Sequence, residues 1–243
     1  MTGASSGIGR ATAQLLAAQG ARVIVHGRDQ RALTELARSI HGVPLCADLS
    51  EPAGAQQLAE QALAATGRID ILVANAGVGW AGPFGEMVAG DIDRLIAVNL
   101  TAPVRLTQAL LPAMAERRSG YLAFVTSIAG RTGVAGEAVY AATKAGLDAF
   151  AESLRLELRG TEVGVGVLVP GVVATRFFER RGRPYARDRP RPMAAEPVAA
   201  ALVGMIDSGA AEVYRPRWLR LPVAVRGCLP GTYRRLAGRF GGT

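Results

Sequence analysis

Tyr140 and Lys144 stand four residues apart in the segment Tyr-Ala-Ala-Thr-Lys. On a helix, positions i and i+4 lie on one face, so the phenol and the ammonium group would face the same way. A phenol has a pKa of about 10 and is a weak base at neutral pH, but a nearby cation favours the phenolate. The pair can therefore act as a general acid–base. Two exposed residues without a chemical role would show the same spacing, so the spacing alone leaves both interpretations open.

The composition of the chain singles out the same place. Lys144 is the only lysine among 28 basic residues, and Asn75 and Asn99 are the only asparagines. A chain that avoids both residue types elsewhere retains them where chemistry does not accept a substitute. A lysine ammonium group is compact, whereas the guanidinium group of arginine is a planar fork. The three residues are therefore candidates for a functional site.

Ser127 follows Leu122–Thr126, a short apolar run that is typical of a strand. Ligands of open α/β sheets bind at the carboxyl ends of the strands, where a serine hydroxyl can donate to a substrate carbonyl oxygen. A serine that caps a turn is the alternative. Asn75 also follows an apolar run. Asn99 stands in a helical segment, where asparagine is unfavourable unless it has a tertiary role.

Glycines 3, 7 and 9 precede or open the first helical segment. Glycine lets a backbone turn tightly and approach a pyrophosphate without a Cβ in the way. The N-terminus of the helix then offers free N–H groups and the positive end of its dipole to the phosphates. The segment predicts a dinucleotide-binding turn, with a purely structural turn as the alternative.

Gly27 and Arg28 follow the next apolar run, at the place where dinucleotide folds that bind NAD carry an acidic residue. A guanidinium group suits a 2′-phosphate, so we expect NADP(H) to be preferred over NAD(H). A solvated arginine at the start of a helix is the alternative. Asp48, directly after the apolar run 43–47, could accept a hydrogen bond from the adenine amino group or cap the helix that follows.

Short strand-like runs alternate with longer segments of helical periodicity. The runs span 22–26, 43–47, 69–74, 121–126, 163–169 and 212–215, and the helical segments span 8–19, 29–39, 52–66, 91–117, 137–159 and 194–207. This alternation predicts an α/β fold, a Rossmann-type doubly wound parallel sheet with helices on both faces. We expect one catalytic domain over residues 1–214, with a substrate loop or lid at 176–192. A basic extension follows at 215–243, where Pro216, Pro222 and Pro230 interrupt the helical signal.

The formal net charge of +8 comes mostly from residues 176–191 and the C-terminal tail. Because the rest of the chain is nearly balanced and carries no nucleic-acid motif, we expect no nucleic-acid partner. There is no apolar run of membrane-spanning length and no signal-peptide pattern. Cys46 and Cys228 lack metal-ligand spacing. We therefore expect a cytoplasmic protein with reduced thiols and no metal.

Taken together, these elements resemble the short-chain dehydrogenase/reductase family. Thr-Gly-x-x-x-Gly-x-Gly, Asn-Ala-Gly, Ser and Tyr-x-x-x-Lys occur in the order and spacing of the family, and residues 170–175 resemble its Pro-Gly segment. The resemblance covers roughly residues 2–207. It implies reversible hydride transfer between a nicotinamide cofactor and a carbonyl or alcohol carbon of a small-molecule substrate.

The resemblance also implies a role for single residues. Tyr140 would be the acid–base, Ser127 would orient the carbonyl, and Lys144 would hold the ribose and lower the pKa of Tyr140. Asn99 would anchor a water that relays protons, and Thr175 would contact the nicotinamide carboxamide. The expected catalytic residues are Ser127, Tyr140, Lys144 and Asn99. The expected cofactor-binding residues are Gly3, Ser5, Ser6, Gly7, Ile8, Gly9, Arg28, Asp48, Leu49, Asn75, Ala76, Gly77, Tyr140, Lys144, Pro170, Gly171, Val173 and Thr175.

The start of the chain departs from the family, which has a central strand directly before the glycine turn. Here only Met1 precedes Thr2. A central strand cannot vanish without opening a gap in a buried ladder. We expect that this sequence is a fragment or that its start codon is misassigned. A third alternative is a fold in which other strands close the gap. Expressed alone, this chain should then be unstable or aggregate.

Several interpretations concern substrate and partners. Trp80, Phe177, Phe178 and Tyr185 fall in segments expected to border the substrate, which favours a medium-to-large apolar substrate. The alternatives are a non-catalytic NADP(H)-binding protein and a catalytically impaired fragment. We expect a homo-oligomer, either a tetramer or a dimer through the helical segments 91–117 and 137–159. The basic tail could lie on an anionic membrane or cover a lipophilic substrate site, or be a solvated or packed extension.

Overall fold

A parallel sheet forms the centre of the computed structural model, which describes residues 1–185 and 190–240. Its strands are β1 (Ile24–Gly27), β2 (Val43–Cys46), β3 (Ile71–Ala74), β4 (Gly120–Val125), β5 (Val163–Pro170) and β6 (Glu212–Arg215). They pair in the orders β1-β2 and β3-β4-β5-β6, and every pair is parallel. The predicted runs agree with these strands to within two residues. The doubly wound α/β fold is confirmed.

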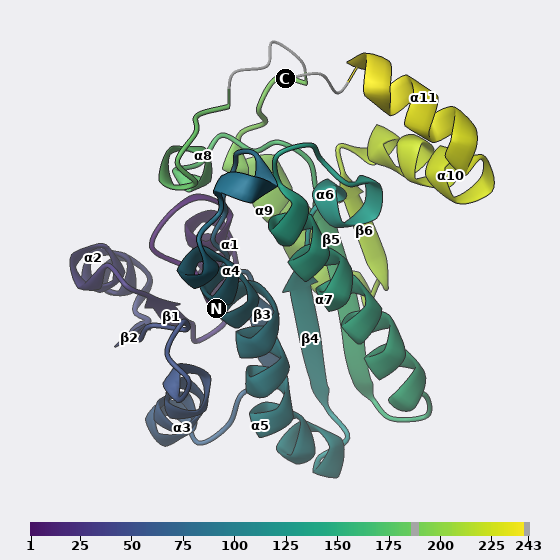
Figure 1. Ribbon diagram of the computed structural model, residues 1–243. Helices are drawn as coiled ribbons and strands as arrows, with labels where there is room; N and C mark the ends of the chain where they lie inside the picture. Colours follow the sequence, from purple (N-terminus) through teal and green to yellow (C-terminus); the bar gives the residue numbers. More distant parts are fainter. Residues whose placement is uncertain (186–189, 241–243) are drawn as a thin grey trace.

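Helices cover both faces of the sheet, and α5 and α7 cross in front of the strands in Figure 1. One face packs α1 (Gly7–Ala18), α2 (Gln30–Ile40) and α9 (Ala195–Ser208), and the other packs α3 (Gly54–Thr66), α5 (Ala102–Glu116) and α7 (Ala138–Glu157). Successive residues of β4 alternate between the two cores: Leu122 and Phe124 join the core under α7, whereas Tyr121 and Ala123 join the core under α9. A strand buried on both faces reads as a continuous apolar run.

Shorter helices surround the carboxyl edge of the sheet. They are α4 (Ala89–Ile96), α6 (Ile128–Thr132) and α8 (Phe177–Arg180), with 3₁₀ turns at Phe84–Glu86 and Arg217–Leu219. The helical segment predicted at 91–117 corresponds to α4 and α5, joined by a π-helical turn at Ala97–Thr101. The predicted loop at 176–192 includes α8, and its residues 186–189 lie outside the described residues.

Met1 and Thr2 lie between β1 and β3, at the position expected for a central strand. The amino group of Met1 donates to the Ile24 carbonyl at 2.9 Å, and the Thr2 N–H donates to the Val73 carbonyl at 3.0 Å. Burial lowers the pKa of the Met1 amino group to about 5. Within the described ranges β1 and β3 do not pair directly. The two parts of the sheet are therefore joined through the first residues of the chain, beside the glycine turn.

The C-terminal extension is helical, so the prediction that prolines interrupt the helical signal is wrong for Pro222, whereas a break between two helices does fall at Pro230. It forms α10 (Arg220–Cys228) and α11 (Pro230–Phe240), which lie beside α6 and β6 in Figure 1. Pro222 stands in the first turn of α10 and Pro230 opens α11. In a first turn the missing N–H of proline has no intrahelical acceptor to lose. Across residues 1–185 and 190–240, the helices are too short or too polar to span a bilayer.

Candidate active site

A cavity of about 1120 Å³ opens where β3, β4 and β5 end and α1 begins. This is the edge at which open parallel sheets bind ligands. Most of the predicted site residues meet there, although they come from distant parts of the sequence. The cavity is lined by Gly3, Ser5, Ser6, Gly7, Ile8, Arg28, Asn75, Ala76, Gly77, Ser127, Tyr140, Lys144, Pro170, Gly171, Val173 and Thr175.

Ser127, Tyr140 and Lys144 form one wall of the cavity, which we call the chemical end. Ser127 is the N-cap of α6, and its Oγ accepts a hydrogen bond from the Ala129 N–H at 3.1 Å. Tyr140 and Lys144 lie one turn apart on α7, and both are buried. The Lys144 Nζ donates to the Val125 carbonyl at 3.0 Å. The face-sharing predicted from the i, i+4 spacing is therefore present, and Ser127 lies against it.

The environment of Tyr140 favours the protonated phenol. Burial raises the pKa of Tyr140 well above its ordinary value, and the hydrogen bond with Ser127 opposes this only in part. Desolvation outweighs the neighbouring groups at Tyr140. The lowering of this pKa by Lys144 that the resemblance implies stays a prediction. Burial also lowers the pKa of Lys144 to about 8, while the charge of Asp148 opposes that shift. The chemical end thus holds a neutral acid beside an ammonium group that can lose its proton near neutral pH.

Asn99 lies behind the cavity wall in the π-helical turn and is fully buried. Its Oδ1 accepts from the Val78 N–H at 2.9 Å, and its Nδ2 donates to the Val78 carbonyl at 2.9 Å and to the Thr143 Oγ1 at 3.2 Å. The side chain therefore connects the segment after β3 to α7. The π-helical turn, a feature that frequently marks functional sites, allows this contact. The water-anchoring role implied by the resemblance stays a prediction.

The glycine turn is held tightly at its base. Gly3 and Gly7 have φ angles of +67° and +55°, in the left-handed region that favours glycine. A Cβ on Gly9 would lie 2.1 Å from the Gly3 carbonyl oxygen, so Gly9 serves packing rather than lining the cavity. The Asn75 Nδ2 donates to the Thr2 carbonyl at 3.0 Å. Ser6, the N-cap of α1, makes no side-chain capping bond, so the first N–H groups of α1 are available to phosphates. The turn fits a dinucleotide.

Arg28 lies at the other end of the cavity. We call Arg28 and the glycine turn together the nucleotide end. The Arg28 Nη1 lies 3.8 Å from the Asp48 Oδ2, and the two side chains are 53% and 40% exposed. Asp48 accepts hydrogen bonds from the Ser50 N–H at 2.9 Å and the Ser50 hydroxyl at 2.7 Å. Leu49 is buried in the core. Asp48 therefore acts as a turn residue here, and neither it nor Leu49 is among the residues that line the cavity.

Aromatic side chains line the cavity beside the chemical end. The ring of Phe177 lies 5.3 Å from that of Tyr140 and 5.4 Å from that of Phe178, between ring centroids. Tyr185 continues the series at 5.3 Å from Phe178. Trp80 lines a smaller adjoining pocket that also reaches Tyr140. Phe177 thus contacts the Tyr140 ring, Trp80 shares the smaller pocket with Tyr140, and Phe178 and Tyr185 continue the apolar wall of the cavity.

Glu137 and Arg181 form an ion pair beside this wall, which the sequence did not reveal. Both line the cavity, and Arg181 is buried. The Arg181 guanidinium also lies 4.6 Å from the ring centroid of Phe178. The backbone carbonyl of Arg181 accepts a hydrogen bond from the Ala81 N–H at 3.2 Å. Glu137 precedes Tyr140 by three residues, a spacing that shares a helix face and could have indicated it. Arg181 carried no such signal among so many arginines.

Comparisons with known proteins agree with this geometry. The family model for short chain dehydrogenases matches residues 1–185. Dehydrogenase/reductase SDR family member 7B from Mus musculus is 34% identical over 187 residues, which are 73% of this chain and 58% of that protein, so the chain spans little more than half of that relative.

Two solved structures share the fold over nearly the whole chain. A short-chain dehydrogenase from Sphingobium yanoikuyae in complex with NADPH has a TM-score of 0.84 and 30% identity, covering 95% of this chain and 94% of its own. A short chain dehydrogenase/reductase from Burkholderia phymatum in complex with NAD has a TM-score of 0.85 and 26% identity, covering 93% and 91%. With the family model matched over most of its length, the chain belongs to the short-chain dehydrogenase/reductase family of oxidoreductases.

Proposed function

We propose that the protein transfers a hydride reversibly between NADP(H) and the carbonyl or alcohol carbon of a medium-to-large apolar substrate. The observation that carries this proposal is the chemical end: Ser127, Tyr140 and Lys144 converge on one wall of a cavity large enough for a dinucleotide and a substrate. A non-catalytic binding protein would have no need for a buried phenol, hydroxyl and ammonium group at that wall.

Tyr140 would act as the acid in carbonyl reduction. Because burial raises its pKa, the phenol keeps its proton at neutral pH and can donate it to a carbonyl oxygen that gains negative charge. The Ser127 hydroxyl would donate to the same oxygen. The Lys144 ammonium group, whose Nζ lies 5.9 Å from the centroid of the Tyr140 ring, would stabilise the phenolate that remains. When bound, the nicotinamide cofactor supplies or accepts the hydride.

The glycine turn and the N-terminus of α1 would hold the pyrophosphate of the cofactor. Arg28 supports the preference for NADP(H), since it lines the cavity where β1 ends and its ion pair with Asp48 is long, at 3.8 Å. A guanidinium group that is half exposed can turn to a 2′-phosphate at little cost. Phe177, Phe178 and Tyr185 support an apolar substrate, because they face the cavity next to Tyr140.

A panel of carbonyl compounds tests the proposal. Aliphatic aldehydes, β-keto esters and aryl ketones would be incubated with the protein and NADPH, and consumption of NADPH would be followed by absorbance, with NADH in parallel. We expect the fastest turnover with aryl ketones and a preference for NADPH of about tenfold or more. NADPH binding without turnover of any compound would favour the non-catalytic alternative. Faster turnover with NADH would contradict the argument from Arg28.

We also propose that the C-terminal extension contacts anionic membranes. From residue 213 onward the sequence has seven arginines and no acidic residue. Trp218, Leu221, Leu229 and Leu236 are 55%, 68%, 58% and 44% exposed. Basic and apolar groups exposed together are typical of helices that lie on anionic lipid surfaces. The full chain should sediment with vesicles that contain phosphatidylglycerol and not with phosphatidylcholine vesicles. Trp218→Ala should weaken binding to the phosphatidylglycerol vesicles. Equal binding to both kinds of vesicle, or binding to neither, would overturn this part of the proposal.

A homo-oligomer is the third part of the proposal. The family forms oligomers commonly, and the exposed Ile96 and Leu156 lie on α4 and α7, near the faces expected to form a dimer. Light scattering on the full chain should give a mass twice that of one chain. A monomer at all concentrations would contradict this part alone.

A further inference from the structure

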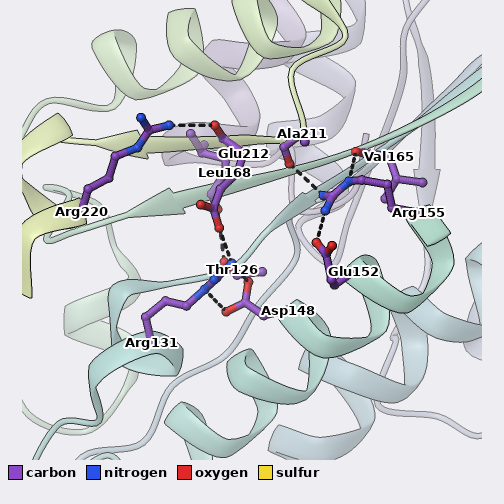
Figure 2. Close-up of polar contacts among 10 residues, drawn as sticks. All are labelled: Thr126, Arg131, Asp148, Glu152, Arg155, Val165, Leu168, Ala211, Glu212 and Arg220. Atoms are coloured by element: carbon purple, nitrogen blue, oxygen red, sulfur yellow. Dashed lines mark hydrogen bonds and ion pairs between the residues drawn. The ribbon is translucent and has the colours of Figure 1, made fainter. Parts of the chain in front are cut away.

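A group of ion pairs behind the chemical end joins three elements of the fold (Figure 2). The Arg131 Nε lies 2.7 Å from the Asp148 Oδ2, and the Arg131 Nη2 lies 3.1 Å from the Asp148 Oδ1. The same Nη2 lies 2.6 Å from the Glu212 Oε1. Since Arg131 is on α6, Asp148 on α7 and Glu212 on β6, one guanidinium group connects two consecutive helices to a strand that lies far along the sequence.

These charges are largely removed from water. The side chain of Asp148 is 9% exposed, and those of Arg131 and Glu212 are 26% and 33% exposed. Asp148 also lies near the hydroxyl of the buried Thr126, which donates to the Leu168 carbonyl at 3.4 Å. Removing one member of a buried pair leaves an uncompensated charge, which is strongly destabilising locally. Arg131 therefore constrains its surroundings more than an exposed ion pair would.

Arg131, Asp148 and Thr126 each lie within one helical turn, along the chain, of a residue of the chemical end. Arg131 itself follows Ser127 by four residues, in the helix that Ser127 caps. Asp148 follows Lys144 by one turn of α7, and Thr126 directly precedes Ser127. A five-residue helix such as α6 is not stable without tertiary contacts. The orientation of Ser127 toward α7 therefore depends on what holds α6.

The C-terminal extension holds the other end of the same helix. Arg226 of α10 donates to the Arg131 carbonyl, and the Tyr233 hydroxyl of α11 donates to the Thr132 carbonyl at 3.1 Å. These contacts provide donors for carbonyl groups at the C-terminus of α6. The last carbonyl groups of a helix have no N–H partner within the helix. The C-terminal extension, β6 and α7 thus all contact Arg131, which lies in the helix that Ser127 caps.

We propose that Arg131 is a positioning residue, which through Asp148 and Glu212 fixes α6 and so holds the Ser127 hydroxyl against Tyr140. This inference rests on the proposed function, because it concerns the same chemical end. Arg131 acts on the reaction only through Ser127. A displacement of a catalytic group by about 1 Å can lower a rate up to a hundredfold, so a helix of one turn held by side chains is a sensitive place for such an effect.

Arg155 offers a matched control on the same side of the sheet (Figure 2). Its side chain is 25% exposed, against 26% for Arg131. It pairs with Glu152 and donates to the Val165 carbonyl at 3.1 Å and the Ala211 carbonyl at 2.8 Å. It therefore links α7 to β5 and to the start of β6 without touching α6. Arg155→Met should loosen the fold to a similar degree and leave Ser127 in place.

The test compares Arg131→Met and Arg155→Met in the full chain, with NADPH and acetophenone as the aryl-ketone probe. We expect Arg131→Met to lower kcat about tenfold with little change in the KM for NADPH, and Arg155→Met to keep kcat within about twofold at a similar loss in Tm. When Ser127→Ala is already present, adding Arg131→Met should lower kcat by less than about a further twofold. The effects of residues that act as a unit are not additive. Arg131→Lys should restore part of the rate.

Three results would overturn the proposal. These are equal losses of kcat in the two methionine variants, full additivity of Arg131→Met with Ser127→Ala, and an unchanged kcat in Arg131→Met. If Arg131→Met does not fold, Glu212→Gln replaces it, with an expected loss of about threefold in kcat against none for Glu152→Gln.

Amide hydrogen exchange separates this inference from the proposed function. If the unaltered protein reduces no carbonyl compound, the proposed function fails by itself. The amides of residues 128–132 should still exchange faster in Arg131→Met, or in Glu212→Gln, than in the corresponding Arg155 and Glu152 variants. Equal exchange in both pairs of variants would show that Arg131 does not hold α6.

Discussion

At the chemical end of the cavity Tyr140 and Lys144 are buried, with Ser127 hydrogen-bonded to the phenol. At the nucleotide end Arg28 is 53% exposed and 3.8 Å from Asp48. Electrostatic effects are strong in the first environment and screened in the second. A substitution at the chemical end should therefore change whether the reaction proceeds, and one at Arg28 should change which cofactor is used.

The two ends also differ in how the sheet supports them. Ser127 follows β4, which lies inside the four-stranded part of the sheet and pairs on both sides. Arg28 follows β1, whose part of the sheet is joined to the rest beside Met1 and Thr2. The nucleotide end should therefore yield first when the fold is destabilised. Three predictions test this comparison.

Tyr140→Phe should have the largest effect, at the chemical end alone. Loss of the phenolic proton should lower kcat/KM for reduction of a carbonyl compound about a thousandfold, or about 4 kcal/mol. The Kd for NADPH, measured by fluorescence, should stay within about threefold, because the ring and its packing on Phe177 are kept. Loss of cofactor binding together with activity would mean that the two ends are not separable.

Acid should weaken the nucleotide end through His26 of β1. His26 is buried, with its Nε2 3.1 Å from the Ala47 carbonyl oxygen, and burial lowers its pKa to about 4. Between pH 6.5 and 4 the unfolded chain binds a proton that the folded protein does not. The free energy of unfolding should therefore fall with pH through this window, by about 2 kcal/mol at pH 5 from His26 alone.

Urea denaturation at pH 7 and pH 5 measures this dependence. His26→Gln should remove about 2 kcal/mol of the difference between the two pH values. His41→Asn is the matched control, since His41 is the other histidine, is exposed and has a φ of +52° that asparagine tolerates. The same acid dependence in all three proteins would rule out His26 as its source.

Arg28→Ala should have the smallest effect. The KM for NADPH should rise about tenfold while the KM for NADH and both kcat values change little, because only the 2′-phosphate contact is lost. The stability of the protein should change by less than about 0.5 kcal/mol, as expected for an exposed ion pair. An equal rise in both KM values would show that Arg28 supports the fold of this end rather than the choice of cofactor.

Short-range patterns determined much of the fold and of the site. The apolar runs predicted the strands, because a strand buried on both faces must be apolar throughout. The spacing of Tyr140 and Lys144 predicted their shared face, and the position of Ser127 after a strand predicted the edge of the sheet at which it lies. Pro222 misled the prediction, because proline is tolerated in the first turn of a helix.

Only the tertiary structure decided which distant charges meet. Arg131, Asp148 and Glu212 are 81 residues apart at most, and in the sequence they do not differ from the solvated charges around them. Their contact depends on how α6 and α7 pack against β6. The raised pKa of Tyr140 has the same origin, because desolvation depends on the depth of a group in the assembled core and not on its neighbours in the chain. The sequence by itself thus determined the chemical groups and their order, while packing decided their protonation and what holds them in place.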